Sequence, residues 1–362
     1  MRVIDADAHV EEGIGHWQYL DSKFYARRPV PLAFPTDTAW GEHNGAWLID
    51  YKLRKFASSP TSMARAQRRL FGVPSQEISD VGERLRDMDR CGIEKQVLYP
   101  STWLGCLAED IQLETALCRS YNTYMATQCN QSGQRLFYAA VLPFRDPAAA
   151  VEEIRRVKAL GSAVSIFIRG MEWDIPIAHP QFWPIYEEAE RQALVMGLHI
   201  GFGSPTIARM FEGMPRPAPD PFPHIHPLAR GMLSNLLIQH ATQGILSSTL
   251  LEDFPTLRWA ILEAGAEWVV PTIRALKHRS KRDGERYFRE GRISISCEPY
   301  EDLPWLMDNL GEDCFVIASD MPHEDDFAHE HPAEAFREKW DLAEPTLEKL
   351  LWANAARLYN LR

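Results

Sequence analysis

The chain has 362 residues, of which 45% are hydrophobic and 25% are charged. This balance is typical of a globular protein and excludes a disordered chain, a coiled coil and a collagen. The net charge of −11 disfavours a nucleic-acid-binding surface, which needs an excess of Lys and Arg. No apolar run approaches the roughly 20 residues of a membrane span, and the N-terminus lacks the apolar segment of a secretory signal. We therefore expect a cytoplasmic protein without nucleic-acid or membrane partners.

The cysteines support the same compartment. They are scattered from residue 91 to residue 314, and no two have CxxC spacing. A disulfide framework or a zinc–thiolate site needs closer clustering. We expect reduced thiols without a structural role in metal binding.

Eight short apolar runs predict the strands of the protein. The runs are continuous rather than alternating, as in strands that are buried on both faces of a parallel sheet. They span Val3–Val10, Lys95–Ser101, Phe137–Phe144, Ala163–Arg169, Leu194–Gly203, Arg258–Gly265, Arg292–Pro299 and Phe315–Pro322. Helical patterns lie between them, so the sequence predicts one (β/α)8 TIM barrel domain over residues 1–362. A doubly wound open sheet is the alternative, but the glycine-rich first turn of its nucleotide-binding form is missing.

Two connections are too long to be simple turns. Residues 11–80 follow the first predicted strand, and the proline-rich residues 204–228 follow the fifth. Both leave the carboxyl ends of strands, where barrel enzymes carry their chemistry. We interpret them as insertion loops over the active-site face, acting as lids or binding loops. The alternative is that they are oligomerisation arms, and such insertions favour a homodimer or higher homo-oligomer.

Candidate metal ligands stand near the ends of four predicted strands. Asp7 and His9 are two residues apart on the first strand, so their side chains project to the same side. His199 is near the end of the fifth strand, Glu263 ends the sixth, and Asp320 ends the eighth. A histidine within an apolar run is often a core residue, but buried carboxylates need a partner. Imidazoles and carboxylates together suit one divalent ion, Zn²⁺ or Mn²⁺.

Several stretches that span nearly the whole chain point to a known family. They are VIDADAHVEE, DMDRCGIEKQVLYPS, LPFRDPAAAVEEIRRVKALG, MGLHIGFG, LLEDFPTLRWAILEAGAEWV and IASDMPHEDD. With these motifs the chain resembles the amidohydrolase-related family, also called amidohydrolase 2. That group contains aminocarboxymuconate-semialdehyde decarboxylase and the resorcylate and carboxyvanillate decarboxylases. The resemblance implies a single divalent ion in a metal-dependent hydrolase type of barrel.

The resemblance places the family's metal ligands on Asp7, His9, His199 and Asp320. The first ligand is a histidine in many members and a glutamate in the aromatic acid decarboxylases, whereas here it is an aspartate. The strand-six position is a catalytic histidine in several members but Glu263 here, which departs from the muconate-semialdehyde pattern. The carboxylated lysine of binuclear members has no counterpart at the end of the fourth strand, where Arg169 stands. A mononuclear site follows.

The resemblance tilts the expected activity toward a carbon–carbon lyase. In that interpretation the metal chelates a carboxylate and an adjacent oxygen of a small aromatic or unsaturated acid, and Asp320 protonates the ring carbon before carbon dioxide leaves. The alternative is a hydrolase of a small amide, ester or C–C bond, with Asp320 or Glu263 as the base for a metal-bound water. A barrel that only binds a ligand is a third hypothesis.

Further residues are candidates for the surroundings of the metal. Arg169 is suited to hold a substrate carboxylate, and its alternative is a structural arginine paired with a strand-end acid such as Glu263. Trp47 and Trp103 would cover the substrate ring, unless they are packing residues. His240 is a secondary catalytic candidate that faces either the pocket or the core. Two residues would support the ligands from behind, namely His323, which would orient Asp320, and Glu298 at the end of the seventh strand.

Overall fold

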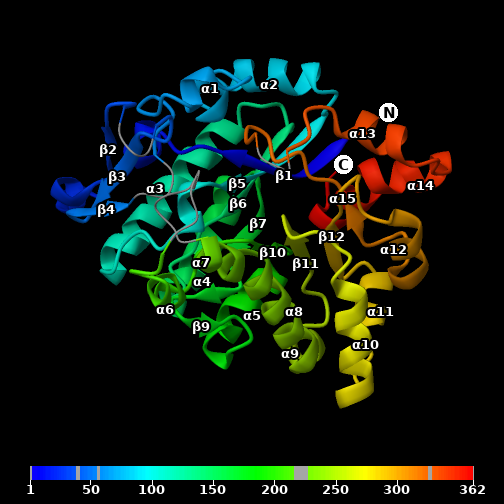
Figure 1. Cartoon of the computed structure of the whole chain (residues 1–362). Helices are drawn as coiled ribbons and strands as arrows, with labels where there is room; N and C mark the ends of the chain where they lie inside the picture. Colours follow the sequence, from blue (N-terminus) through cyan, green and yellow to red (C-terminus); the bar gives the residue numbers. More distant parts are fainter. Residues whose placement is uncertain (1, 38–40, 55–57, 216–226, 325–327, 362) are drawn as a thin grey trace.

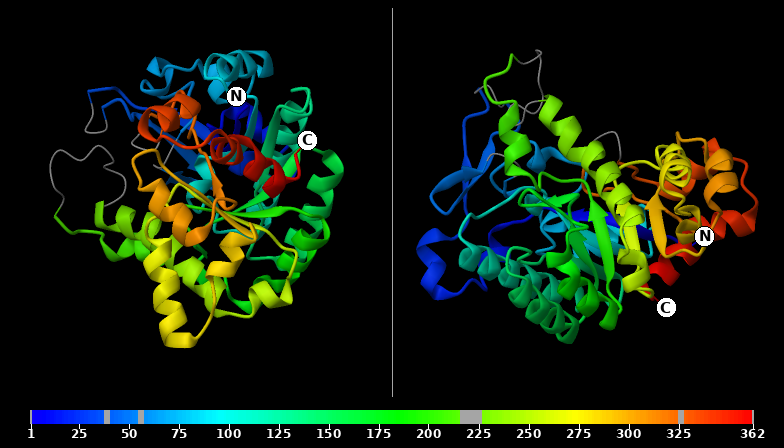
Figure 2. Two further views of the ribbon diagram at one scale, coloured as in Figure 1. Left: turned by 90° about the vertical axis from the view of Figure 1, so that its right-hand side faces the viewer. Right: turned by 90° about the horizontal axis from the view of Figure 1, so that it is seen from below.

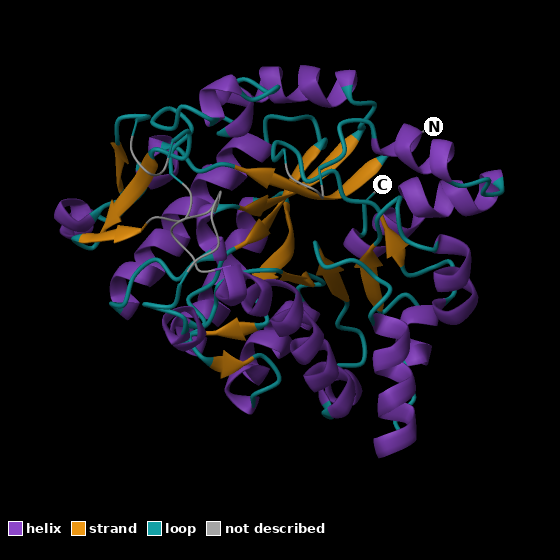
Figure 3. Ribbon diagram, viewed as in Figure 1, coloured by secondary structure: helices purple, strands orange, loops and turns teal. Residues whose placement is uncertain are grey.

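Eight parallel strands form a nearly closed barrel surrounded by helices in the computed structural model of the chain (Figures 1 and 3). The structure describes residues 2–37, 41–54, 58–215, 227–324 and 328–361. The barrel strands are β1 (Ile4–Val10), β5 (Lys95–Pro100), β6 (Leu136–Ala140), β7 (Ala163–Ile168), β10 (Val195–His199), β11 (Trp259–Leu262), β12 (Ile293–Ser296) and β13 (Phe315–Val316). Each lies within a run that the sequence predicts, except that β6 begins one residue earlier, and the predicted TIM barrel is confirmed.

The strands follow one another around the barrel in chain order. Backbone hydrogen bonds then join the two ends of the sheet, because the N–H of Ala6 donates to Ile317 at 3.0 Å and the N–H of His9 donates to Met321 at 2.7 Å. A third bond runs the other way, from the N–H of Asp320 to the carbonyl oxygen of Asp7 at 3.0 Å. The first and last strands therefore meet beside the residues predicted to hold the metal.

Helices cover the outside of the barrel, and their ends follow ordinary capping chemistry. The carboxylate of Asp146 accepts the N–H of Ala149 at 3.0 Å to begin α4, and Gly161 ends that helix with φ 93°. The helices are α1 (Val73–Gln76), α2 (Val81–Arg90), α3 (Ile111–Cys129), α4 (Pro147–Leu160), α5 (Trp183–Arg191), α6 (Pro205–Met210), α7 (Pro227–Gly231), α8 (Leu237–Ser247), α9 (Leu250–Asp253), α10 (Val269–Ser280), α11 (Glu285–Arg289), α12 (Leu303–Leu310), α13 (Pro332–Lys339), α14 (Glu344–Glu348) and α15 (Asn354–Tyr359).

Shorter elements complete the list. Among the described residues, the 3₁₀ turns are η1 (Ile14–Trp17), η2 (Ser22–Arg27), η3 (Ala66–Arg68), η4 (Thr102–Leu104) and η5 (Pro180–Phe182), and the π-helical segments are η6 (Met232–Leu236) and η7 (Lys349–Ala353). A small hairpin pairs β8 (Met171–Glu172) with β9 (Ile175–Pro176). Within the described ranges, no helix is both long enough and apolar enough to cross a bilayer.

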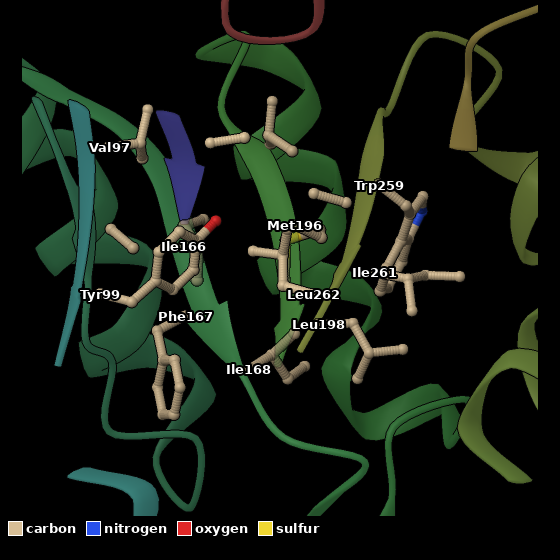
Figure 4. Close-up of a cluster of buried hydrophobic side chains, with 14 of the residues drawn as sticks. Val97, Tyr99, Ile166, Phe167, Ile168, Met196, Leu198, Trp259, Ile261 and Leu262 are labelled. Carbon is tan, nitrogen blue, oxygen red and sulfur yellow. The ribbon is translucent and has the colours of Figure 1, made fainter. Parts of the chain in front are cut away.

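Buried side chains from β5, β7, β10 and β11 pack closely against one another (Figure 4). Gly197 is required here, because a Cβ at this position would lie 2.3 Å from the hydroxyl oxygen of Tyr99. The Tyr99 hydroxyl lies 2.9 Å from Oγ of Ser165, so this buried polar group has a partner. Gly197 and His199 point to the same side of β10. The closely packed side chains around Gly197 therefore support the part of β10 that carries His199.

The first insertion is more ordered than a loop. It contains an antiparallel sheet of β2 (Val30–Ala33), β3 (Gly45–Ile49) and β4 (Lys52–Arg54). This sheet lies beside the barrel, on the side away from α13 and α14 (Figures 1 and 2). The second insertion includes α6, and its residues 216–226 lie outside the described residues. That residues 1–362 form one domain with both insertions over the active-site face stays a prediction.

Candidate metal centre

β1 places Asp7 and His9 side by side. Alternate residues of a strand project to the same side, and both side chains are fully buried. Nε2 of His9 lies 3.7 Å from Oδ1 of Asp7. The pairing of β1 with β5 is irregular between Asp5 and Ala8, directly beside this pair.

His199 is the last residue of β10, and its ring meets that of His9. The Nε2 atoms of the two imidazoles lie 3.1 Å apart. Nδ1 of His199 lies 2.8 Å from the carbonyl oxygen of Ile200, which assigns the proton to Nδ1 and leaves the lone pair on Nε2. The ring of Tyr99 stacks on that of His199 with 5.5 Å between centroids. The orientation that a metal-binding histidine needs is thus built into the strand and its neighbours.

Glu263 and Asp320 follow β11 and β13 with backbone φ values of 53° and 54°. This left-handed region is uncommon for residues other than glycine, and such residues cluster at functional sites. Oε2 of Glu263 lies 2.9 Å from Nε2 of His199, and Oδ1 of Asp320 lies 3.4 Å from Nε2 of His9. The two turns therefore bring both carboxylates to the imidazole pair.

These side chains converge closely enough to hold one cation. One ligand atom from each of Asp7, His9, His199 and Glu263 lies within 4.8 Å of the others, and His9, Asp320 and His323 form a second group of this kind. Among the described residues, neither carboxylate oxygen of Asp7 has a hydrogen-bond donor. A buried carboxylate without a partner is costly, and a bound cation removes that cost. The donor set therefore fits a divalent ion.

The electrostatics of the group favour positive charge. Burial raises the pKa of Asp7 well above its usual value, in opposition to the nearby His199 and with a contribution from Glu263. Burial lowers the pKa of His199, but the carboxylates of Asp7 and Glu263 outweigh it and raise that pKa to about 9. The shift of Asp7 comes mainly from burial and that of His199 from the two buried carboxylates, whose negative charge a divalent ion would neutralise.

His323 connects Asp320 to a buried ion pair. Its Nδ1 lies 2.7 Å from Oδ1 of Asp320, and its Nε2 lies 3.3 Å from Oε1 of Glu11 and 3.1 Å from Oγ of Ser101. Arg69 donates to the same Glu11 oxygen at 2.6 Å. This chain of contacts is the arrangement that an orienting role for His323 requires.

Glu298 follows the end of β12 by two residues and is buried. Its Oε2 lies 2.8 Å from Nε2 of His329. Burial raises the pKa of Glu298, and the negative charge of Glu263 contributes to this shift. Glu298 is thus a neighbour of the metal-ligand candidates, outside the groups that could bind the ion.

The predicted substrate role of Arg169 does not match its contacts. Its Nε donates to Glu172 at 3.1 Å, its Nη2 donates to the other carboxylate oxygen of Glu172, and its Nη1 donates to the carbonyl oxygen of Gly105 at 2.9 Å. Every guanidinium nitrogen is therefore engaged within the protein. The structure favours the alternative of a structural arginine, although its partner is Glu172 in the β8 hairpin rather than Glu263.

Three further candidates have no recorded contact with the buried ligand group among the described residues. Trp47 is fully buried on β3 and packs edge-on against Trp17, with 6.0 Å between ring centroids. Trp103 is buried in the same core, 6.4 Å from Tyr121. These contacts are those of packing residues, and the role of the two tryptophans as a cover for the substrate ring stays a prediction. His240 is exposed on α8, so the structure does not bring it into the buried group.

Sequence reasoning missed the polar residues that hold β1 against the last strand. The carboxylate of Asp5 accepts the N–H of Ser319 at 2.9 Å and the Nε2–H of Gln96 at 2.9 Å. Nη2 of the fully buried Arg84 donates to the carbonyl oxygens of His9 and Met321, both at 3.1 Å. A signal was available for Arg84, because it follows Val81 by three residues on the apolar face of α2.

The fold and the site together define a metal-dependent barrel of the hydrolase type. The amidohydrolase family matches residues 4–361 of the chain. The protein therefore belongs to the amidohydrolase family.

Individual proteins of known activity or structure are also similar to this chain. The chain is 26% identical over 292 residues to gamma-resorcylate decarboxylase of Rhizobium sp. (strain MTP-10005), covering 77% of this chain and 86% of the relative. An amidohydrolase from Mycobacterium avium subsp. paratuberculosis K-10 superposes with a TM-score of 0.80, at 21% identity over 99% of both chains. A dihydroxybenzoic acid decarboxylase from Polaromonas sp. JS666, with bound manganese and the inhibitor 2-nitroresorcinol, superposes with a TM-score of 0.61, at 23% identity over 77% and 85% of the chains. At these identities the solved structures establish the shared fold.

Proposed function

We propose that the protein is a metal-dependent decarboxylase of a small aromatic carboxylic acid. The observation that carries this proposal is the facing pair of His9 and His199, flanked by Asp7, Glu263 and Asp320. It is supported by the relative that decarboxylates gamma-resorcylate and by the manganese-bound decarboxylase of similar fold. The ion is Mn²⁺ or Zn²⁺, because two imidazoles with carboxylates suit ions of borderline hardness.

In this proposal Asp7, His9, His199 and Glu263 would hold the ion, and the Oδ1 atom of Asp320 lies 3.4 Å from Nε2 of His9. The resemblance places Asp320 rather than Glu263 among the ligands, and we assign Glu263 to them because its carboxylate lies in one group with Asp7, His9 and His199. When bound, the ion would supply a Lewis acid that orients the substrate carboxylate and its neighbouring oxygen and withdraws electrons from them. All five side chains are buried, so their charges would act on the substrate with little screening by water.

Asp320 carries the proton of the reaction. It delivers this proton to the ring carbon that bears the carboxylate. The bond between that carbon and the carboxyl carbon then breaks, its electron pair restores the aromatic ring, and carbon dioxide leaves. His323, held by Glu11, fixes the carboxyl group of Asp320 through Oδ1. Solvent returns the proton to Asp320 after each turnover.

The test combines metal analysis with substrate turnover. The purified protein is loaded with Mn²⁺ or Zn²⁺ and incubated with a panel of hydroxybenzoates, and carbon dioxide release is measured. We expect release from at least one member, and a loss of about 10²- to 10⁴-fold in kcat in the D320N variant. A metal-loaded protein that releases no carbon dioxide from any member, or a D320N variant with full activity, would contradict the proposal.

We also propose that the protein works in the cytoplasm as a homo-oligomer. All six cysteines are free in the structure, as expected in a reducing compartment. Large apolar side chains are exposed on the first insertion, including Tyr25 and Tyr51, and they would be covered by a second copy. Light scattering of the purified protein tests this, and a monomeric mass at micromolar concentration would contradict it.

A further inference from the structure

One carboxylate outside the ligand group ties together the two segments that follow β11 and β12. Oε1 of Glu301 accepts the N–H of Ala266 at 2.6 Å and the N–H of Glu267 at 3.0 Å. Its Oε2 accepts the N–H of Glu298 at 2.8 Å. The side chain is buried, so these three bonds are formed away from water.

The first of these segments has a backbone that needs external support. Glu263 and Gly265 both have positive φ, 53° and 63°. A Cβ on Gly265 would lie 3.0 Å from Oε1 of Glu301, so the carboxylate fits closely into the curve of the chain. Successive N–H groups that converge on one anion form a nest. Strained residues of this kind persist only when their surroundings hold them in place.

The carbonyl side of the same segment is also held. The indole Nε1–H of Trp268 donates to the carbonyl oxygens of Ala264 and Gly265, at 3.0 and 2.8 Å. Glu301 holds the N–H side of the segment, because its carboxylate accepts the N–H groups of Ala266 and Glu267. Its three partners are all backbone groups, so Glu301 acts on the side chains of Glu263 and Glu298 only through the chain that carries them.

We propose that Glu301 is a positioning residue of the metal centre, which aims the Glu263 carboxylate at His199 and keeps Glu298 beside it. This inference rests on the proposed function, in which Glu263 is a metal ligand. Glu301 itself binds neither the ion nor the substrate. Removing its carboxylate lets the segment from Glu263 to Glu267 relax, and the ion loses a ligand of correct geometry.

The test is the E301Q variant, which keeps the size of the side chain but replaces one acceptor oxygen with an amide nitrogen. At least one of the three N–H groups then loses its acceptor. We expect the affinity of the metal-free protein for Mn²⁺, measured by calorimetry, to fall about 10- to 100-fold, as for other residues that support metal ligands. The visible absorption spectrum of the Co²⁺ form should change as well, because it reports the ligand geometry.

The matched control is E267Q. Oε1 of the exposed Glu267 accepts the N–H of Asp302 at 3.0 Å, so this variant removes an equal charge and weakens a bond between the same two segments. We expect its Mn²⁺ affinity and Co²⁺ spectrum to match those of the wild type. Thermal unfolding of the metal-free proteins shows whether each variant is folded.

Three outcomes would overturn the inference. Wild-type affinity and an unchanged Co²⁺ spectrum in folded E301Q would overturn it while leaving the proposed function intact. Equal losses in E301Q and E267Q would show that charge alone, rather than the buried hydrogen bonds, matters. A wild-type protein that takes up no Mn²⁺ or Co²⁺ would overturn both this inference and the proposed metal centre.

Discussion

The Nε2 atoms of His9 and His199 lie 3.1 Å apart at the carboxyl ends of β1 and β10. Because the carbonyl oxygen of Ile200 holds the Nδ1 proton of His199, its Nε2 lone pair is directed at the ring of His9. At this separation the two nitrogens share either a proton, in a hydrogen bond, or a metal ion. The buried carboxylates of Asp7 and Glu263 around the pair favour a cation at this end of the barrel.

Replacing His199 with asparagine should therefore weaken metal binding. We expect a larger loss of Mn²⁺ affinity than the about 10- to 100-fold caused by removing a residue that only supports a ligand. Calorimetric titration of the metal-free protein measures it. H278N is the control, because His278 is exposed on α10. An H199N variant with wild-type affinity would contradict the ligand assignment.

A second prediction concerns the support of Asp320. In H323F the ring is kept, but the 2.7 Å contact with Oδ1 of Asp320 and the contact with Glu11 are lost. We expect kcat for carbon dioxide release to fall about 10- to 100-fold, with a much smaller change in KM. The H331F variant makes the same substitution outside the ligand group and should behave like the wild type. An unchanged kcat in H323F would contradict the role of His323 in orienting Asp320.

Arg84 should contribute to the free energy of unfolding of the protein. Its guanidinium joins the backbone at His9 to that at Met321 and also donates to Gln96 at 2.9 Å. In R84A these buried acceptors lose their donor and a cavity remains, so the free energy of unfolding should fall by at least about 3 kcal/mol. Urea denaturation measures this change.

The control for Arg84 lies on the same helix. Arg86 is exposed, and R86A should change the free energy of unfolding by no more than about 0.5 kcal/mol. Equal effects of the two substitutions would show that the buried hydrogen bonds of Arg84 contribute little.

The buried carboxyl group of Glu12 should make the free energy of unfolding depend on pH. Burial raises its pKa from 4.5 to about 8, although the Thr102 N–H that it accepts at 2.7 Å opposes the shift. The folded protein thus keeps this proton up to about pH 8, whereas the unfolded chain releases it near pH 4.5. Stability contributed by the protonated form is therefore lost as the pH rises between these values.

The E12Q variant cannot release that proton. The free energy of unfolding of E12Q minus that of the wild type should therefore increase by about 3–5 kcal/mol as the pH rises from 5 to 8. Urea denaturation of both proteins across this range measures the difference, and E267Q serves as an exposed control. Parallel profiles for E12Q and wild type would contradict a buried, protonated Glu12.

Residue identity at strand ends made much of the fold and the site predictable. The continuous apolar runs predicted all eight barrel strands because those strands are buried on both faces. Asp7, His9, His199 and Glu263 could be placed near one another because the carboxyl ends of barrel strands meet. The pairing of Arg169 with Glu172 was not predictable in the same way, since it depends on how the β8 hairpin folds back over three residues.

The interior of the first insertion could not be predicted either. Strands β2 and β4 contain no fully buried residue, so their sequence carries no strong pattern. Trp47 looked like a binding residue because it lies in a long connection, yet β3 buries it against Trp17. The partners of Asp5 and Arg84 come from segments far apart in the chain, and local sequence does not specify them.

The direct hydrogen bond from the N–H of Asp320 to the carbonyl oxygen of Asp7 has a consequence for the newly made protein. Two of the five residues at the metal centre come from the first barrel strand and one follows the last, so the centre cannot form until nearly the whole chain has left the ribosome. A nascent chain that ends before residue 320 carries both histidines without the segment that closes the barrel around them. Uptake of the ion is therefore expected to follow synthesis and to report that the barrel has closed.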